Sequence, residues 1–186
     1  MITSINSSYF NLQKGGNILY PTDTVWGIGC DATNEKAVTK IFHIKKREES
    51  KSLVILVNNI EMLRQYVDEI PARLIDILKK AKKPTTVIYK NPKGLAKNVI
   101  AKDNTVAIRI AQDEFCQELI KKLGKPIVST SANISGSRTP STFKEIDQSI
   151  LDEVDYVVNL YQDKINDSPS KIIRIGKGGE LEVIRE

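Results

Sequence analysis

Four cationic side chains lie close together at the point where the sequence predicts the end of a helix: Lys45, Lys46, Arg47 and Lys51. The spacing of Val38, Ile41 and Phe42 predicts an amphipathic helix over residues 35–46. Lys45 continues this apolar stripe, so its ammonium is expected to point toward the body of the protein, where it could bind an anion. A helix C-terminus also favours cations because its dipole is negative there, so the cluster alone leaves a purely structural role open.

Hydroxyl and amide groups follow a predicted buried strand that starts at residues 126–128. If the chain stays extended, the two-residue period of a strand places Ser129, Ser131 and Asn133 on one side. Two hydroxyls and an amide in this arrangement can hold the oxygens of a phosphate, a carboxylate or a ribose. A polar turn at the end of a strand would have the same composition, so the stretch alone does not decide between the two.

Arg109 lies in a predicted strand, residues 105–110, in which the alternate positions are apolar. It shares a face with Thr105, and an arginine in such surroundings usually has an anionic partner. That partner could be an Asp or Glu of the protein or the carboxylate of a ligand. Another hydroxyl-bearing segment, residues 168–170 with Ser170, precedes a predicted strand and fits either a ligand contact or simple turn chemistry.

Several common catalytic arrangements are missing from the sequence. Residues 176–179 lack the spacing and the Ser/Thr of a phosphate-binding Walker loop, and there is no Gly-x-Ser-x-Gly segment. One histidine, His43, and two cysteines, Cys30 and Cys116, cannot form a Cys/His metal site, and the cysteines are expected to be free thiols. Residues 22–30 combine hydroxyls with two glycines, which suits close approach of a ligand to the backbone. Cations and hydroxyls act by positioning and charge stabilisation, as in phosphoryl and nucleotidyl transfer.

The composition is that of an ordinary globular protein, with 40% hydrophobic and 27% charged residues. The length of 186 residues predicts a single domain over residues 1–186. A net charge of +5 and a pI near 9.1 favour phosphate-bearing ligands or RNA, although no aromatic stacking motif supports RNA. The chain starts without the pattern of a signal peptide and has no apolar stretch of membrane-spanning length, so we expect a cytoplasmic location and no membrane partner.

Short predicted strands and helices are mixed along the chain without strict alternation. The predicted strands are residues 17–20, 53–57, 85–90, 105–110, 126–128, 154–158, 171–175 and 181–184. The predicted helices are residues 35–46, a short helix capped by Asn58 or Asn59 that ends at Val67, a helix from Pro71 with Leu74, Ile77 and Leu78 as its core stripe, and residues 115–123 and 142–150. This mixture predicts an α/β or α+β fold with an open, twisted, mixed sheet and flanking helices.

Five segments, taken in order, resemble the signatures of the YrdC-like family of threonylcarbamoyl-adenylate synthases. They are Tyr20–Gly29, Lys45-Lys46-Arg47 as the family's Lys-x-Arg element, Val106–Arg109, Ser131-Ala132-Asn133 as its Ser-x-Asn element, and Ser168-Pro169-Ser170. The resemblance runs from about Gly15 to Ile175, which is most of the chain. One of these motifs would be a weak signal, whereas all of them in the family's order are a specific one.

The resemblance implies a fold and a reaction. The family has an open, twisted α/β sheet with a concave, positively charged cleft. L-threonine and bicarbonate form a carbamate, which attacks the α-phosphate of ATP, expels pyrophosphate and leaves threonylcarbamoyl-AMP. A partner complex then transfers the threonylcarbamoyl group to adenosine 37 of tRNA. Mg²⁺ is expected to arrive with ATP, bound through the phosphates rather than in a protein cage.

The resemblance also implies roles for particular residues. Lys45 and Arg47 would be catalytic, because they would bind the triphosphate and offset the charge that builds on the leaving pyrophosphate. The ATP-binding set would be Lys45, Arg47, Lys51, Thr105, Ser131, Asn133 and Arg138. The threonine-binding set would be Thr22, Arg109, Ser129 and Ser170, with the guanidinium of Arg109 as a bidentate clamp on the carboxylate.

The chain departs from the family pattern in several places. Residues 81–86 replace the Trp-Pro-Gly-Pro that often precedes a central threonine, Glu48 stands where proline is usual, and Leu56 stands where longer relatives carry histidine. The last predicted strand ends near the C-terminus, as expected for the short form without the extra C-terminal domain. Two alternatives stay open: a family paralogue that has lost synthesis and binds double-stranded RNA, tRNA or a nucleotide, and a pure double-stranded-RNA-binding module that uses the basic cleft.

Overall fold

The computed structural model describes residues 1–48, 52–165, 168–176 and 179–186. Within these residues, nine strands form one sheet in the order β7-β1-β2-β6-β3-β5-β4-β8-β9. The strands are β1 (Ile18–Tyr20), β2 (Gly27–Gly29), β3 (Val54–Val57), β4 (Thr85–Lys90), β5 (Thr105–Ile110), β6 (Ile127–Ser131), β7 (Tyr156–Val157), β8 (Lys171–Ile175) and β9 (Leu181–Arg185). Lys51, one of the predicted ATP ligands, lies outside the described residues.

Parallel and antiparallel neighbours are combined in this sheet. The pairs β1–β7, β3–β5 and β4–β8 are parallel, and the remaining neighbours are antiparallel. The predicted mixed sheet is therefore confirmed. The bounds of β4 and β5 agree with the predicted residues 85–90 and 105–110, because both strands show the expected β-branched and alternating composition.

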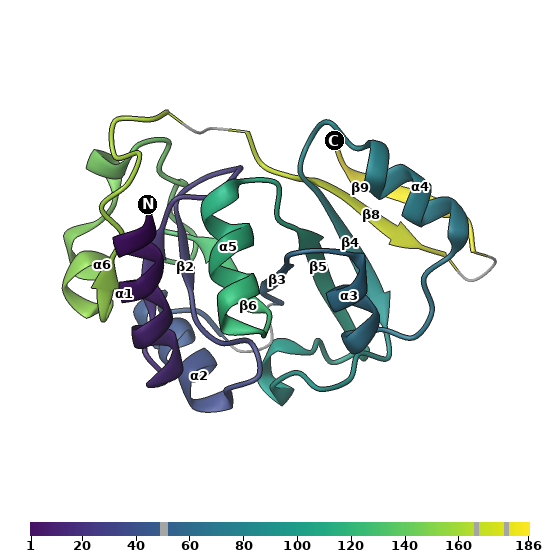
Figure 1. Ribbon diagram of the computed structural model, residues 1–186, viewed down its shortest axis with the longest axis horizontal. Coiled ribbons are helices and arrows are strands. Elements are labelled where there is room, and N and C mark those ends of the chain that lie inside the picture. The colour runs from purple at the N-terminus through teal and green to yellow at the C-terminus, as the bar shows by residue number, and fades with distance from the viewer. Residues whose placement is uncertain (49–51, 166–167, 177–178) are drawn as a thin grey trace.

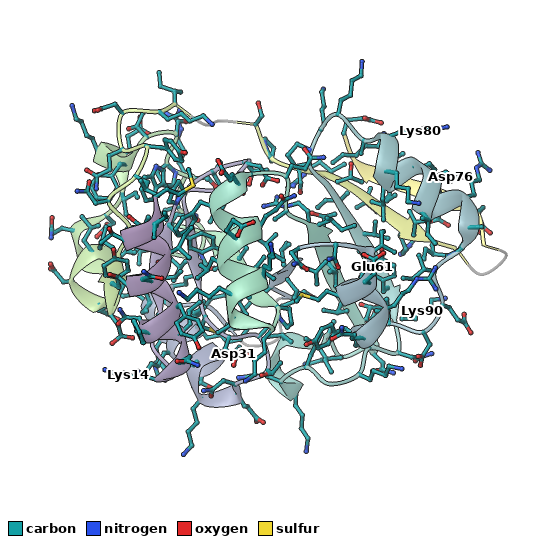
Figure 2. All side chains as sticks on the ribbon, in the orientation of Figure 1. Lys14, Asp31, Glu61, Asp76, Lys80 and Lys90 are labelled. Carbon is teal, nitrogen blue, oxygen red and sulfur yellow. The ribbon has the colours of Figure 1, made fainter. Side chains whose placement is uncertain are left out.

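Helices cover the sheet: α1 (Ile2–Gln13), α2 (Glu35–Ile44), α3 (Ile60–Tyr66), α4 (Ala72–Lys80), α5 (Glu114–Leu123) and α6 (Gln148–Glu153). Figure 1 shows α1 and α5, which pack against each other, over the half of the sheet that contains β2 and β6. Figure 1 also shows α3 and α4 over the half that contains β4 and β8. The charged side chains of α4 that are labelled in Figure 2, Asp76 and Lys80, point away from the sheet. In the part of the chain that the structure describes, no helix combines the length and the apolar character needed to cross a membrane.

Side-chain and glycine caps define the ends of several helices. Asn34 accepts a hydrogen bond from the backbone N–H of the third residue of α2, at 3.2 Å, and Asn59 does the same for α3, at 2.8 Å. Asp113 caps α5 through the N–H of Cys116 at 2.8 Å. Gly124 ends α5 with φ of 69°, a conformation that costs a residue with a side chain more than glycine. The sequence predicted a cap at Asn58 or Asn59 and a helix end at Gly124, and the structure confirms Asn59 and Gly124.

Several features of the fold differ from the sequence-based expectations, among them β2, which was not predicted as a strand. The N-terminal helix α1 was not predicted, because Ser4 and Ser8 are buried on the face that packs and so hide its apolar pattern. The helix predicted over residues 142–150 is wrong: a 3₁₀ turn at Phe143–Glu145 and the separate helix α6 replace it, and Asp147 caps the latter through Ser149 at 2.9 Å. Ile77 is 36% exposed, so the core stripe of α4 narrows to Leu74 with partial burial of Leu78.

Candidate active site

A cavity of about 500 Å³ opens beside the central strands, a volume typical of small-molecule sites. Its lining comes from the loop before β2, from the start of β3, and from β5 and β6, together with residues 139–141 and 169–170. Among the described residues, three arginines line it, Arg47, Arg109 and Arg185, and no carboxylate does. The lining therefore supports the expectation of a concave basic cleft.

The register of the central strands brings the predicted hydroxyls and Arg109 into this cavity. Ser129 of β6 pairs with Val54 of β3, and Arg109 of β5 pairs with Leu56 two residues further along β3. Cross-strand partners share a face of the sheet, so Ser129 and Arg109 face the same side. Gly27 of β2 completes the floor: a methyl group there would lie 3.3 Å from the hydroxyl of Ser129.

Arg109 has a partner within the protein and also faces the cavity. Its side chain is 4% exposed, and Nη2 lies 2.9 Å from Oδ1 of Asp23 as an ion pair that lacks hydrogen-bond geometry. Nη1 donates to Oγ1 of Thr24 at 3.3 Å, and Nε is buried without an acceptor among the described residues. A buried N–H without an acceptor costs about 1–3 kcal/mol, so the guanidinium has unused capacity for a ligand oxygen.

Ser129 and Ser131 both line the cavity, but Thr130 between them lines it too, so the lining does not follow the predicted alternation. Asn133 does not line it, because its side chain stabilises the turn that follows β6. Its Oδ1 accepts from the hydroxyl of Ser131 at 2.6 Å, and its Nδ2 donates to the carbonyl of Ser137 at 2.7 Å. Ser170 lines the cavity and shares a hydrogen bond of 2.8 Å with the hydroxyl of Thr86.

Lys45 points into the body of the protein, as predicted, and is 1% exposed. Its Nζ donates to the carbonyls of Ser131 at 2.5 Å and Asn133 at 2.7 Å, and it lies 3.4 Å from Oδ1 of Asn133. Its own carbonyl accepts from the N–H of Ser135 at 2.8 Å. Burial, and then the charge of Arg47, lower the pKa of Lys45 to about 7. Lys45 is therefore behind the cavity lining, where it holds the turn at residues 131–135.

The remaining predicted nucleotide ligands occupy different environments. Arg47 lines the cavity, donates from Nη2 to the carbonyl of Ser52 at 2.9 Å, and has its pKa lowered by burial. Thr105 shares the face of Arg109 on β5 but does not line the cavity, and its hydroxyl donates to Asp103 at 2.7 Å. Arg138 is exposed and does not line the cavity, whereas the next residue, Thr139, does.

Thr22, a predicted threonine ligand, is buried outside the cavity lining. Its hydroxyl donates to the carbonyl of Val25 at 2.7 Å and accepts from the N–H of Thr24 at 3.0 Å. Thr24 takes its place in the lining and contacts Arg109. No role was predicted for Thr24, although it lies in the hydroxyl-bearing segment 22–30.

Arg185 of β9 is a lining residue that the sequence did not indicate. Its Nε and Nη2 donate to the carbonyl of Ser170 at 3.0 and 2.7 Å, so the last strand fixes a hydroxyl-bearing turn of the cavity. Its position lies beyond Ser170, the last residue of the five signature segments. The only available signal was its place at the end of a short strand, which is too weak to identify a site residue.

The two cysteines are buried free thiols, as predicted. Burial raises the pKa of both thiols, and Asp31 beside Cys30 and Asp113 beside Cys116 raise it further. Neither cysteine lines the cavity. Among the described residues, no group of three or more His, Cys, Asp and Glu side chains is arranged to hold a metal ion.

Comparison with known proteins identifies the family. A model of the Sua5-YciO-YrdC family, described as "Telomere recombination", matches residues 11–186. A Methanocaldococcus jannaschii protein provisionally named threonylcarbamoyl-AMP synthase is 39% identical over 166 residues, which are 88% of this chain and 76% of that protein. The threonylcarbamoyl-AMP synthase of Pseudoalteromonas translucida is 34% identical over 151 residues, 80% of this chain and 81% of that protein.

Solved structures show the same fold. The crystal structure of E. coli YciO has a TM-score of 0.84 at 25% identity and covers 98% of this chain and 88% of its own. P. abyssi Sua5 complexed with L-threonine has a TM-score of 0.86 at 24% identity. That match covers 97% of this chain but 53% of P. abyssi Sua5, so the chain spans about half of the latter's length. On the family match and the relatives at 34–39% identity, the chain belongs to the Sua5-YciO-YrdC family.

Proposed function

We propose that this protein is a threonylcarbamoyl-AMP synthase, which makes threonylcarbamoyl-AMP and pyrophosphate from L-threonine, bicarbonate and ATP. The observation that carries the proposal is a single cavity lined by Arg47, Arg109 and neighbouring hydroxyls, in a chain whose relatives bear this enzyme name. The substrates are all anionic or bear a carboxylate, which matches a lining of guanidinium groups and hydroxyls.

Arg47 and Arg109 reach the cavity from different elements, so they can bind different groups of the substrates. Arg47 follows α2 and is held by the carbonyl of Ser52, whereas Arg109 lies on β5 and pairs in register with Leu56. We assign the amino-acid carboxylate to Arg109 and the phosphates to Arg47.

The threonine position follows from the groups around Arg109. Ser129 and Ser170 line the same cavity and can bind the amino acid's polar groups. P. abyssi Sua5, which has this fold, was solved with L-threonine bound. Thr22 would contribute by bracing Thr24, which contacts Arg109. The amine of the bound threonine would then attack the carbon of bicarbonate. The amine loses a proton and the carbon loses a hydroxide, which leave together as water, and the N–C bond of the carbamate is formed.

Nucleotidyl transfer would proceed by attack of a carbamate oxygen on the α-phosphorus of ATP. That P–O bond forms as the bond to pyrophosphate breaks, and Arg47 offsets the charge that grows on the leaving oxygen. Ser131 lines the cavity and would contact the nucleotide. Lys45 would hold Ser131 in position through its hydrogen bond to the Ser131 carbonyl. None of the other predicted nucleotide ligands Thr105, Asn133 and Arg138 lines the cavity. Their side chains would have to move in order to contact the nucleotide.

Mg²⁺ would enter with ATP. The described lining offers hydroxyls and no carboxylate, so the ion would be bound mainly by phosphate oxygens and water. It would supply charge neutralisation at the phosphates. The activated product would then be consumed by a complex that transfers the threonylcarbamoyl group to adenosine 37 of tRNA.

The proposal is tested by incubating the protein with ATP, Mg²⁺, bicarbonate and L-threonine and measuring pyrophosphate release. Release is expected to require both threonine and bicarbonate. Equal release without either co-substrate would contradict the proposal and indicate simple hydrolysis of ATP. Binding of double-stranded RNA without any synthesis would favour the alternative of a non-catalytic paralogue.

A further inference from the structure

Asp23 is a buried carboxylate that contacts Arg109 without lining the cavity. The side chain of Asp23 is 8% exposed, that of Arg109 is 4% exposed, and Oδ1 and Nη2 lie 2.9 Å apart. Arg109 is part of the cavity lining and Asp23 is not. Asp23 therefore contacts a lining residue, Arg109, without forming part of the lining itself.

The second oxygen of Asp23 ties this pair to the end of β5. Oδ2 accepts from the backbone N–H of Gln112 at 3.0 Å, and the side chain of Gln112 donates to the carbonyl of Ala81 at 3.0 Å. The carboxylate thus links the guanidinium to the backbone that follows β5, and Gln112 in turn links that backbone to Ala81. An asparagine at this position has a single oxygen, so it could accept from Gln112 or face Arg109 with an acceptor, but not both.

The loop that carries Asp23 is itself braced. Thr22 bonds to the N–H of Thr24 and to the carbonyl of Val25, which closes the loop on itself. Thr24 also accepts from Nη1 of Arg109 at 3.3 Å. Two adjacent residues of this internally bonded loop therefore contact two nitrogens of the guanidinium, which fixes the orientation of the clamp in advance.

We propose that Asp23 is a positioning and specificity residue, which orients Arg109 for the amino-acid carboxylate and keeps other small anions from this position. The inference rests on the proposed function. Without Asp23, the buried guanidinium would be an uncompensated charge, and any small anion would relieve it. With Asp23, the charge is already offset, so binding depends on the geometry of the remaining N–H groups rather than on charge alone.

The test compares the steady-state parameters of Asp23→Asn, Asp23→Glu and a matched control. Asp23→Asn is expected to raise the threonine KM about ten- to a hundredfold, the scale for losing one hydrogen bond between the substrate carboxylate and the misoriented guanidinium. It is also expected to make inorganic phosphate a competitive inhibitor against threonine. The ATP KM is expected to stay within about twofold. Asp23→Glu keeps the charge, so its threonine KM should lie between those of the wild type and Asp23→Asn.

Asp31→Asn is the control, because Asp31, labelled in Figure 2, is a buried carboxylate outside the lining that pairs with Lys125 at 2.8 Å. It should lower the melting temperature and leave both KM values unchanged. If Asp23→Asn and Asp31→Asn have the same threonine KM and the same response to phosphate, the role of Asp23 is refuted and the proposed function stands. If wild-type protein shows no threonine-dependent pyrophosphate release, the proposed function itself is refuted. Should Asp23→Asn fail to fold, Asp23→Glu decides, since an unchanged threonine KM there would also overturn the inference.

Discussion

Lys45 and Arg109 are both almost fully buried cations, yet they contact different acceptors. Lys45 donates to the backbone carbonyls of Ser131 and Asn133 and lies behind the cavity lining. Arg109 pairs with Asp23, contacts Thr24 and faces the cavity. Burial therefore does not by itself identify a ligand-binding cation. The two cations differ in their contacts. The ammonium of Lys45 donates to backbone carbonyls, whereas the guanidinium of Arg109 lines the cavity.

Arg47, the other predicted catalytic cation, should produce the largest effect. Because it lines the cavity and is assigned to the phosphates, Arg47→Ala is expected to lower kcat by about a hundred- to a thousandfold, or roughly 3–4 kcal/mol. The melting temperature should change little, since the guanidinium is partly exposed. Pyrophosphate release and a thermal melt on the same sample check this. A kcat within tenfold of the wild-type value would show that Arg47 does not have the proposed catalytic role.

Arg109→Lys should have the next largest effect, on threonine rather than on turnover of ATP. Lysine keeps the charge near Asp23 but cannot form two parallel hydrogen bonds with a carboxylate. We expect the threonine KM to rise by about ten- to a hundredfold, corresponding to roughly 1.5–3 kcal/mol, with a smaller change in the ATP KM. Steady-state kinetics with each substrate varied separately measure both. A larger effect on the ATP KM than on the threonine KM would show that Arg109 has been assigned to the wrong ligand.

Lys45→Met should mainly reduce stability. Methionine fills the buried volume but leaves the carbonyls of Ser131 and Asn133 without their donor, at a cost of about 1–3 kcal/mol. For a protein of this size, that lowers the melting temperature by roughly 2–4 °C per kcal/mol. The threonine KM should change less than threefold, which is about 0.6 kcal/mol. Normal stability with a large loss of turnover would instead support direct contact of Lys45 with a phosphate.

The proton of Lys45 should give the most specific effect, a pH dependence of stability rather than a loss of activity. Its folded-state pKa of about 7 lies below the value of about 10.4 for an unfolded lysine, so the unfolded state binds more protons between these pH values. Stability from this group therefore rises with pH through that window and is lost as the pH falls toward 7. The wild type should gain up to about 1.4 kcal/mol per pH unit relative to Lys45→Met. Urea denaturation at several pH values from neutral to alkaline measures it, and parallel curves for the two proteins would contradict it.

Sequence patterns predicted the parts of the fold in which side-chain periodicity reports burial directly. The alternation of residues 105–110 and the glycine at 124 correspond to β5 and to the end of α5. The helix α1 was not predicted because two of its buried positions are serines, which interrupt the apolar periodicity of the sequence. The predicted helix over residues 142–150 failed because Asp147 starts a new helix instead of continuing one.

Residue types and spacing predicted several residues of the site, but they did not predict which contacts each side chain makes. Arg47, Arg109, Ser129, Ser131 and Ser170 line the cavity. Thr22, Lys45 and Asn133 instead form hydrogen bonds that shape loops behind it, a distinction that depends on where each side chain's partner lies in three dimensions. Arg185 reaches the cavity only because β9 is the last strand beside β8, which no local pattern encodes.

The most direct test of the account is calorimetric titration of L-threonine into wild type, Arg109→Lys and Lys45→Met. The account predicts binding to the wild type, a Kd within about threefold of that value for Lys45→Met, and a Kd at least about tenfold weaker for Arg109→Lys. Equal weakening in both variants, or no change in Arg109→Lys, would contradict the central claim that Arg109 binds the amino acid while Lys45 only supports the turn behind it.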